Sequence, residues 1–239
     1  MVRRNSMIYN VIVCDDENDI RSALNIYLSG EGYRIFEAKN GKEALDIIES
    51  EDIHLLLLDI MMPVMDGITT LAKLREHSNI PVILLTAKSQ AADKISGLNV
   101  GADDYITKPF NPTEVAARVK SQLRRYMRLG GTADNIAKSS AIVNGGIEFD
   151  EKTKTVTVDG DPVSLTPTEM MLLRLFMHNP GVVFSPKEIY KKVWNDDPLG
   201  AENTVTVHIR HLREKIEINP ANPDYIKSVW GHGYKMEKK

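Results

Sequence analysis

Short polar motifs stand where apolar, strand-like runs of this chain end. Asp15 and Asp16 follow one such run, Asp59 closes a second, and Thr86 and Lys108 close two more. In a parallel α/β sheet, side chains at the carboxyl ends of the strands gather at one edge. Carboxylates there suit Mg²⁺, while an amine and a hydroxyl can neutralise phosphoryl oxygens. The spacing therefore predicts a carboxylate that accepts a phosphoryl group beside a metal site.

Each of these residues also has a simpler interpretation when it is taken alone. Asp15 and Asp16 could cap a helix, and Asp59 could end a strand. Their joint occurrence on successive strand ends argues against three unrelated roles. A Mg²⁺-dependent phosphatase acting on a small molecule is a rival function. Phosphatases of the dehalogenase type need a second aspartate two residues after the first, where Met61 stands.

The first half of the chain alternates strand-like and helix-like segments. Apolar runs and apolar residues at a helical period mark them in turn. The sequence predicts strands at 7–13, 33–38, 55–58, 81–85 and 104–107, and helices at 17–29, 41–50, 67–76, 91–100 and 112–128. Five β-then-α units predict an α/β domain with a five-stranded, doubly wound parallel sheet of the flavodoxin-like type.

The pattern changes after residue 128. Residues 129–145 are rich in small and polar side chains and predict a linker. Beyond the linker, the sequence predicts short strands at 147–149 and 153–158, helices at 168–178, 186–193 and 203–218, and a hairpin at 225–236. This order is typical of a winged helix-turn-helix α+β domain. The predicted domains are therefore 1–128 and 146–239, joined by 129–145.

Composition restricts the class of protein. The net charge is −3, and one cysteine cannot form an internal disulfide. No apolar run reaches the length of a membrane span, and residues 1–6 do not open a signal peptide, so Met7 is a candidate natural start. We expect a cytoplasmic protein without a membrane partner. Any nucleic-acid binding must come from local charge, and residues 203–235 carry five basic side chains against three acidic ones.

On these motifs, residues 7–128 resemble the receiver domain of two-component response regulators. The resemblance implies that a sensor histidine kinase phosphorylates Asp59. It implies that Mg²⁺ is held by Asp15, Asp16, Asp59 and the backbone carbonyl of Met61. It also implies roles for Thr86, Tyr105 and Lys108 as the switch hydroxyl, the switch aromatic and the lysine beside the phosphate. Pro109 is expected to follow Lys108 through a cis bond.

A second set of residues concerns assembly. In the OmpR/PhoB subfamily, matching positions pair across a two-fold interface that forms on phosphorylation; here they are Lys94, Asp103, Asp104, Glu114, Arg118 and Arg125. Glu114, Arg118 and Arg125 share one face of the last receiver helix. The resemblance implies a homodimer. The alternative is a solvated face whose local ion pairs contribute little to stability.

Residues 146–236 resemble the winged-helix domain of OmpR/PhoB regulators. The match implies base contacts from Thr204, Thr206, Val207 and His211, phosphate contacts from Asn203, His208, Arg210 and Arg213, and a wing with Trp230, His232 and Tyr234 near the minor groove. The loop at 194–201 would be offered to RNA polymerase or to a neighbouring protomer. Packing under the wing is an equal alternative for Trp230. Some family members have arginine where His211 and Trp230 stand, so their target sequence does not transfer.

The segments 118–126, 165–169 and 207–215 most resemble the regulators of inducible glycopeptide (vancomycin-type) resistance. We therefore expect a transcription factor, not an enzyme, that dimerises on phosphorylation of Asp59 and binds paired promoter half-sites. The alternative is a regulator that binds DNA without phosphorylation and keeps a vestigial acidic site.

Overall fold

The computed structural model describes residues 8–87, 101–130, 141–195 and 203–239. The chain divides into two compact units, Met1–Arg124 and Arg125–Lys239, and each is described by itself. Among the described helices, none is long and apolar enough to cross a membrane.

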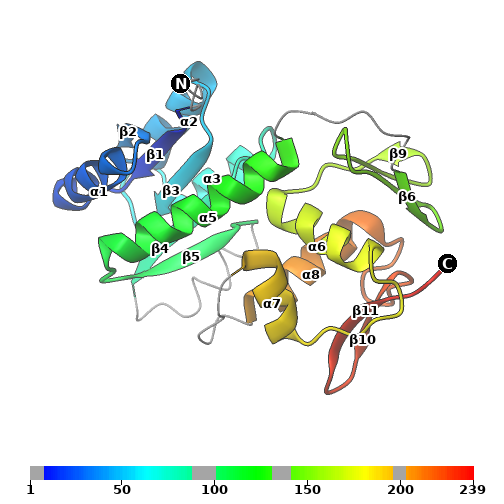
Figure 1. The fold of residues 1–239 in the computed structure, drawn as a ribbon. Helices are drawn as coiled ribbons and strands as arrows, with labels where there is room; N and C mark the ends of the chain where they lie inside the picture. Colours follow the sequence, from blue (N-terminus) through cyan, green and yellow to red (C-terminus); the bar gives the residue numbers. More distant parts are fainter. Residues whose placement is uncertain (1–7, 88–100, 131–140, 196–202) are drawn as a thin grey trace, which may run out of the picture. The chain divides into compact units, whose positions relative to one another are not determined.

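The first unit contains a five-stranded parallel sheet with the order β2-β1-β3-β4-β5 (Figure 1). This order is that of the flavodoxin-like doubly wound fold, as predicted. The strands are β1 (Asn10–Cys14), β2 (Arg34–Ala38), β3 (Leu55–Asp59), β4 (Val82–Ala87) and β5 (Asp104–Lys108). The helices are α1 (Asn18–Gly30), α2 (Gly41–Ser50), α3 (Gly67–Arg75) and α5 (Pro112–Gly130). The helix expected at 91–100 lies outside the described residues.

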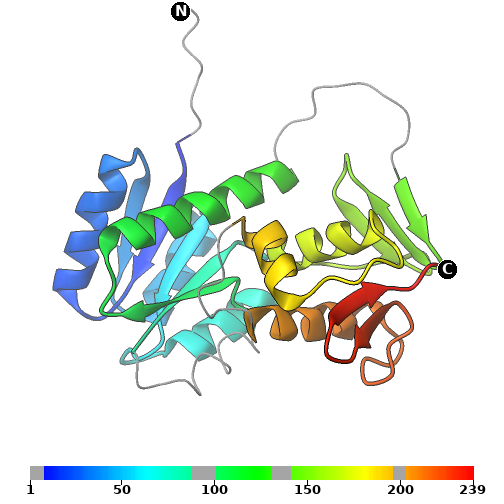
Figure 2. The same cartoon turned by 60° about the horizontal axis from the view of Figure 1, so that its bottom comes forward.

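Continuous apolar strands make the centre of this sheet inaccessible from both faces. Leu55 to Asp59 are all buried, as expected for a parallel strand covered by helices on each side. Alternate strand residues such as Val11, Leu57 and Ile83 pack with residues of α1 and α5. These two helices lie on the same side of the sheet (Figure 2).

The strand register brings the polar strand ends to one level. Cys14 pairs with Leu58, so Asp15 and Asp59 are the next residues on neighbouring strands. Asp59 pairs with Leu85 on β4, one residue before Thr86. The predicted convergence of strand ends therefore follows from the observed pairing.

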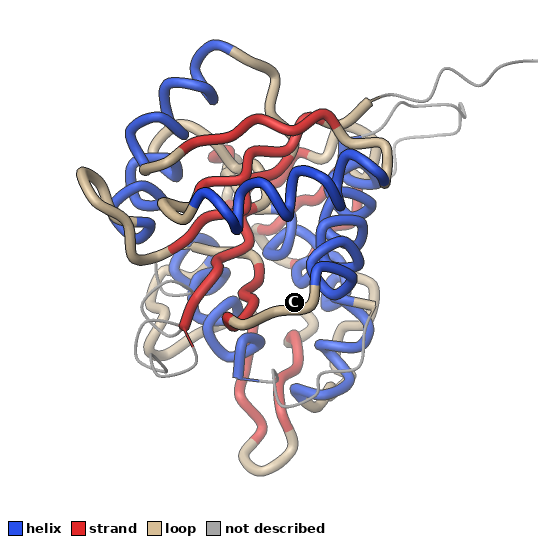
Figure 3. Tube along the Cα trace, turned by 90° about the vertical axis from the view of Figure 1, so that its left-hand side faces the viewer, coloured by secondary structure: helices blue, strands red, loops and turns tan. Residues whose placement is uncertain are grey.

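The second unit has an antiparallel sheet, three helices and a hairpin. The sheet is β6 (Ala141–Asn144), β7 (Ile147–Asp150), β8 (Thr155–Val158) and β9 (Asp161–Pro162). The helices are α6 (Pro167–Met177), α7 (Pro186–Trp194) and α8 (Asn203–Ile216). The hairpin is β10 (Ile226–Val229) and β11 (Gly233–Met236), and its two paired strands project from the domain in Figure 3.

The predicted linker, 129–145, is too long at both ends. Helix α5 continues to Gly130, and β6 occupies the last residues of the segment; residues 131–140 are not described. The Asn144 side chain donates to the carbonyl of Glu237 at 2.8 Å and accepts from the amide of Lys239 at 2.8 Å. This attachment joins residues far apart in sequence, so local composition could not reveal it.

Capping residues define where the helices of the second unit begin. Thr166 and Glu169 form a reciprocal capping box before α6, with Pro167 in the first turn. Glu169 is buried and also pairs with Lys215 of α8 at 2.7 Å. Helix α6 is thereby attached to α8 by the same side chain that starts it.

Candidate functional site

The carboxyl ends of β1 and β3 form an acidic cluster. Asp15, Asp16 and Asp59 each offer a carboxylate oxygen, and these atoms lie within 4.8 Å of one another. Asp15 and Asp59 are buried, whereas Asp16 is exposed. The cluster therefore combines two desolvated carboxylates with an opening to solvent. Oxygen ligands of this kind suit Mg²⁺.

Lys108, at the end of β5, supplies the positive charge of this cluster. Its Nζ lies 2.7 Å from Asp15 Oδ2 and 2.8 Å from Asp59 Oδ1. The predicted cis bond between Lys108 and Pro109 is present. Glu17 adds a contact that sequence reasoning missed, with Oε1 3.4 Å from the amine. Its place two residues after Asp15 was the available signal.

The protonation of this group follows from burial and pairing. Burial raises the pKa of Asp59 above its ordinary value, and the bond from Lys108 only partly offsets this. Burial alone would lower the pKa of the Lys108 amine, but its bonds to Asp15 and Asp59 outweigh burial and raise it. The lysine is therefore a permanent cation at neutral pH. It favours the ionised form of Asp59, which is the nucleophilic form.

Met61 completes the group of residues predicted to hold a cation. Its amide donates to Asp59 Oδ2 at 3.0 Å, so its backbone lies directly beside the acceptor. Its side chain is exposed. Three carboxylates and a neighbouring backbone, with room toward solvent, fit a Mg²⁺ ion that keeps part of its water shell.

The predicted switch residues lie on the two adjacent strands. Thr86 is buried at the end of β4 and pairs with Thr107 in the sheet. Its hydroxyl lies 3.4 Å from the carbonyl of Ala87, a long hydrogen bond. Tyr105 is half-buried on β5. Strand β4, which carries Thr86, is next to β3, and strand β5 carries both Tyr105 and Lys108.

In the second unit, α8 carries the polar face predicted to meet DNA. Thr206 and Arg210 are exposed one turn apart, and Val207 is half-buried between them. Arg210 Nε lies 2.9 Å from Glu214 Oε1, an exposed pair that water and salt weaken. The side chain of Asn203 lies outside the described part. Thr206 and Arg210 are therefore accessible on α8, and their contact with DNA stays a prediction.

Three of the predicted contact residues differ from expectation. Thr204, His208 and His211 are buried, with 1%, 1% and 6% of their surface exposed. They form one row along α8, because residues four and three apart share a helix face. The ring of His208 packs against Trp194 of α7, with centroids 5.4 Å apart, and His211 meets His208 edge-on. None of these three side chains is exposed in this structure.

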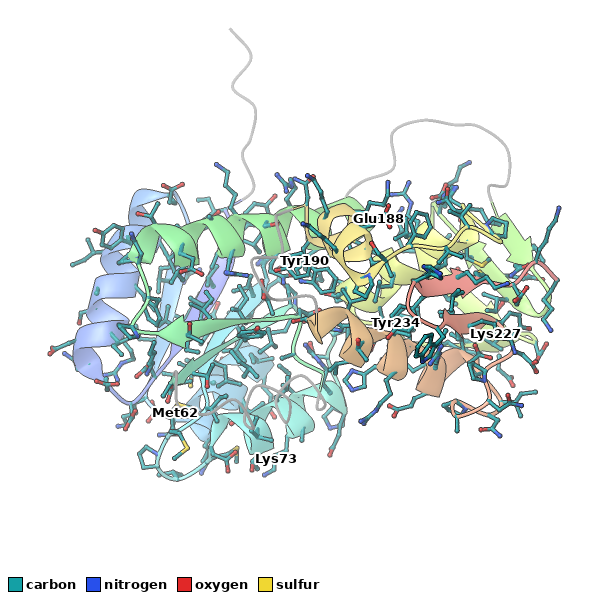
Figure 4. The ribbon with its side chains drawn as sticks, turned by 90° about the horizontal axis from the view of Figure 1, so that it is seen from below. Met62, Lys73, Glu188, Tyr190, Lys227 and Tyr234 are labelled. Carbon is teal, nitrogen blue, oxygen red and sulfur yellow. The ribbon has the colours of Figure 1, made fainter. Side chains whose placement is uncertain are left out.

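The hairpin presents Trp230 at its turn. Its side chain is 96% exposed, which rules out packing under the wing in this structure. His232 is also exposed, and Gly231 adopts φ +72° in the turn between them. The hydroxyl of Tyr234 donates to Thr206 Oγ1 at 3.2 Å, so this tyrosine contacts α8. Figure 4 shows Tyr234 on the β10–β11 hairpin.

Comparison with known proteins agrees with this geometry. Residues 11–120 match the family described as response regulator receiver domain, and residues 160–236 match transcriptional regulatory protein, C terminal. Regulatory protein VanR of Enterococcus faecium is 44% identical over 229 residues, which cover 95% of this chain and 98% of VanR. The chain is an OmpR/PhoB-family response regulator.

Two solved structures share this regulator's organisation. A cysteine-to-serine mutant of RitR superposes with a TM-score of 0.76 at 24% identity, covering 97% of this chain and all of the other; this likeness concerns the fold. The Thermotoga maritima OmpR/PhoB homologue DrrB is 30% identical over 97% of this response regulator and all of its own chain, with a TM-score of 0.50.

The predicted dimer face of this response regulator is partly different from expectation. Asp103 is fully buried, where it accepts from Arg75 and from the amide of Val82, each at 3.0 Å. It therefore holds the receiver together internally and is not an interface residue in this structure. Arg118 pairs within the chain with Asp104 at 3.0 Å and with Glu114 at 3.2 Å. Lys94 and the Arg125 side chain lie outside the described residues.

Proposed function

We propose that Asp59 is the phospho-acceptor of this response regulator and that a sensor histidine kinase is the donor. An Asp59 oxygen forms the bond to phosphorus as the bond from phosphorus to the kinase histidine nitrogen breaks, and that nitrogen keeps the electron pair. The observation that carries the proposal is the contact of Lys108 with both Asp59 and Asp15. The amine orients the carboxylate and can pair with a phosphoryl oxygen once it is attached.

Asp15, Asp16, Asp59 and the Met61 carbonyl are the proposed ligands of a Mg²⁺ ion. Bound there, the ion supplies positive charge to the transferring phosphoryl oxygens. The acidic cluster and its opening at Asp16 support this assignment. Thr86 and Tyr105 are the proposed switch: the Thr86 hydroxyl turns toward the phosphate, and the Tyr105 ring moves into the vacated space.

The proposed consequence is assembly on promoter DNA in the cytoplasm. Asp104, Glu114 and Arg118, with Lys94 and Arg125, would exchange their partners across a receiver dimer. Two winged-helix domains would then bind paired half-sites, with an increase in avidity that needs no new base contact. Thr206, which is exposed, and Val207, which is half-buried, are the proposed groove contacts, and Arg210 is the proposed phosphate contact. Trp230 and His232 are the proposed wing contacts. The loop at 194–201 is proposed for RNA polymerase.

For Thr204, His208 and His211, a DNA contact requires that their row on α8 become exposed, so we do not count them among the contacts of the structure as it stands. We further propose genes of vancomycin-type resistance as the regulated genes. The motif resemblance and the 44% identity to Regulatory protein VanR support this choice.

The first test combines intact mass with light scattering. Wild type and Asp59→Asn are incubated with Mg²⁺ and a small acyl-phosphate donor. We expect one added phosphoryl group and a doubled molar mass for wild type, and neither for the variant. Phosphorylation without a change in molar mass would refute the dimer and leave the acceptor assignment intact. Equal phosphorylation of both proteins would refute Asp59 as the acceptor. If neither the acyl-phosphate donor nor the Asp59→Asn substitution changes the affinity for DNA, the phosphorylation-independent regulator would be favoured.

A further inference from the structure

Two charged residues, one on α8 and one just after its end, contact the wing: Arg213 is half-buried and Glu217 is buried. Arg213 and Glu217 are four residues apart and lie on the same side of the helix axis. Arg213 donates from Nε and Nη2 to the carbonyl of Ile226 at 2.9 and 2.7 Å, and from Nη2 to Ser228 Oγ at 3.0 Å. Its guanidinium also lies over the Tyr234 ring, 5.7 Å from the centroid.

Glu217 accepts hydrogen bonds from three successive backbone amides. They come from Asp224 at 2.6 Å, from Tyr225 at 3.0 and 3.1 Å, and from Ile226 at 2.8 Å. Glu217 is 8% exposed. A buried carboxylate is stable in a fold when its oxygens accept bonds of this kind. The Glu217 carboxylate therefore binds the backbone of residues 224–226, which leads into β10.

The two side chains hold the same residue by both of its backbone polar groups. Ile226 offers its amide to Glu217 and its carbonyl to Arg213. It stands opposite Met236 in the hairpin ladder, with its own polar groups turned to the outer edge of β10. A two-stranded hairpin is marginally stable in water by itself. Its outer edge therefore needs partners, and α8 provides them.

We infer that Arg213 and Glu217 are positioning residues that fix the wing relative to α8, so that both reach adjacent grooves of one DNA site at the same time. This inference rests on the proposed DNA binding. Arg213 was predicted to contact phosphate, but its Nε and Nη2 are bonded to Ile226 and Ser228 in this structure. Tyr234, bonded to Thr206 and covered by Arg213, is the third connection between the hairpin and the helix.

The test uses Glu217→Gln in the full chain, with Glu214→Gln as the matched control. Each variant removes one negative charge near the end of α8, but Glu214 is exposed and pairs with Arg210 of its own helix, not with the wing. The probes are a duplex that wild type enriches from a random pool and an unselected duplex of equal length. Electrostatics alone predicts that both variants bind each duplex slightly more tightly, because removing an acid reduces repulsion from phosphates.

A positioning role instead predicts that Glu217→Gln weakens binding to the selected duplex. Glu217→Gln should bind the selected duplex about tenfold more weakly, the size of one lost base-pair contact, with an unchanged salt slope on the unselected duplex. Arg213→Lys keeps the positive charge but lacks the planar guanidinium that bonds to β10. It should also weaken binding to the selected duplex and leave the salt slope on the unselected duplex unchanged. If Glu217→Gln matches Glu214→Gln on both duplexes, the inference is overturned.

Hydrogen exchange separates this inference from the proposed DNA binding. The amides of residues 224–226 should exchange at least about tenfold faster in Glu217→Gln than in wild type, while those in the middle of α8 keep their rates. Unchanged exchange at 224–226 would overturn the inference. A wild type that enriches no duplex would refute the proposed DNA binding, and the exchange result would still decide the wing contact.

Discussion

Lys108 Nζ lies 2.8 Å from Asp59 Oδ1 and so occupies one side of the proposed phospho-acceptor. The same amine reaches Asp15 at 2.7 Å. The two carboxylates are the buried members of the acidic cluster, and the lysine compensates their mutual repulsion. A cation that binds the acidic cluster therefore competes with the Lys108 amine for Asp15 and Asp59.

Replacing Lys108 with methionine should change Mg²⁺ affinity and the rate of phosphorylation in opposite directions. Without the amine, Asp15 and Asp59 lose their paired positive charge, so we expect Mg²⁺ to bind about tenfold more tightly. Phosphorylation from an acyl-phosphate donor should slow by roughly 10²-fold, as when one preorganised charge partner is removed. Calorimetric titration and time-resolved intact mass measure the two quantities. Lys42→Met, at an exposed lysine of α2, should change neither; weaker Mg²⁺ binding by Lys108→Met would contradict this account.

Gly67 allows α3 to start against the backbone of the acceptor strand. A Cβ there would collide with the carbonyl oxygen of Asp59 and lie 2.9 Å from Cα of Ile60. Gly67→Ala should therefore lower the free energy of unfolding of the receiver by about 1–3 kcal/mol and slow phosphorylation. Gly30→Ala is the control, because a Cβ at Gly30 meets none of the described atoms within 4 Å. Urea unfolding that ranks the two variants equally would count against the steric explanation.

Val64 carries backbone strain in the loop after β3. Its φ is +70°, a left-handed conformation that a β-branched residue adopts at a cost, and its side chain is 82% exposed. Val64→Gly should raise the free energy of unfolding by about 0.5–1 kcal/mol, because the relieved strain exceeds the added chain entropy. Val182→Gly, at a half-exposed valine without positive φ, should lower it instead. A loss of stability in Val64→Gly would show that the strain costs less than the added chain entropy.

Glu151 should give the second unit a pH-dependent contribution to stability. Burial alone would raise the pKa of Glu151, but hydrogen bonds with His178 at 2.9 Å and Arg174 at 2.7 Å outweigh it and lower the pKa. A pKa lowered by folding stabilises the protein above the ordinary value, and this stability is lost as pH falls through the folded value. The difference in unfolding free energy between wild type and Glu151→Gln should therefore shrink as the pH falls below the ordinary glutamate value of 4.5. A constant difference would show that the lost contacts do not depend on the carboxylate charge.

Arg210 should contact phosphate without reading sequence. It is exposed on α8 with Glu214 as an ion-pair partner, so its charge is available to DNA. Arg210→Ala should weaken binding to selected and unselected duplexes alike, and should reduce the salt slope by about 0.9, the value for one phosphate. Fluorescence anisotropy at several salt concentrations measures both. A loss confined to the selected duplex would instead make Arg210 a base contact.

Local patterns in the sequence determined much of the architecture. Apolar strands ending in Asp15, Asp59, Thr86 and Lys108 predicted the doubly wound sheet and the meeting of their side chains, because parallel strands present their carboxyl ends at one edge. The capping box at Thr166 is a local feature as well, because a cap depends on residues three apart. These features depend on neighbours in the chain, which a sequence displays directly.

Tertiary structure alone decided which polar residues face inward. Asp103 looks like an interface acid, but Arg75 and the Val82 amide make it an internal one. His208 is buried, and the ring of Trp194 from another helix lies beside it. By sequence alone, Glu217 and Arg213 are ordinary charged helix residues, whereas in the structure both bond to Ile226 of β10. In each case the deciding partner is distant in sequence, and burial by a distant partner leaves no local periodic signal.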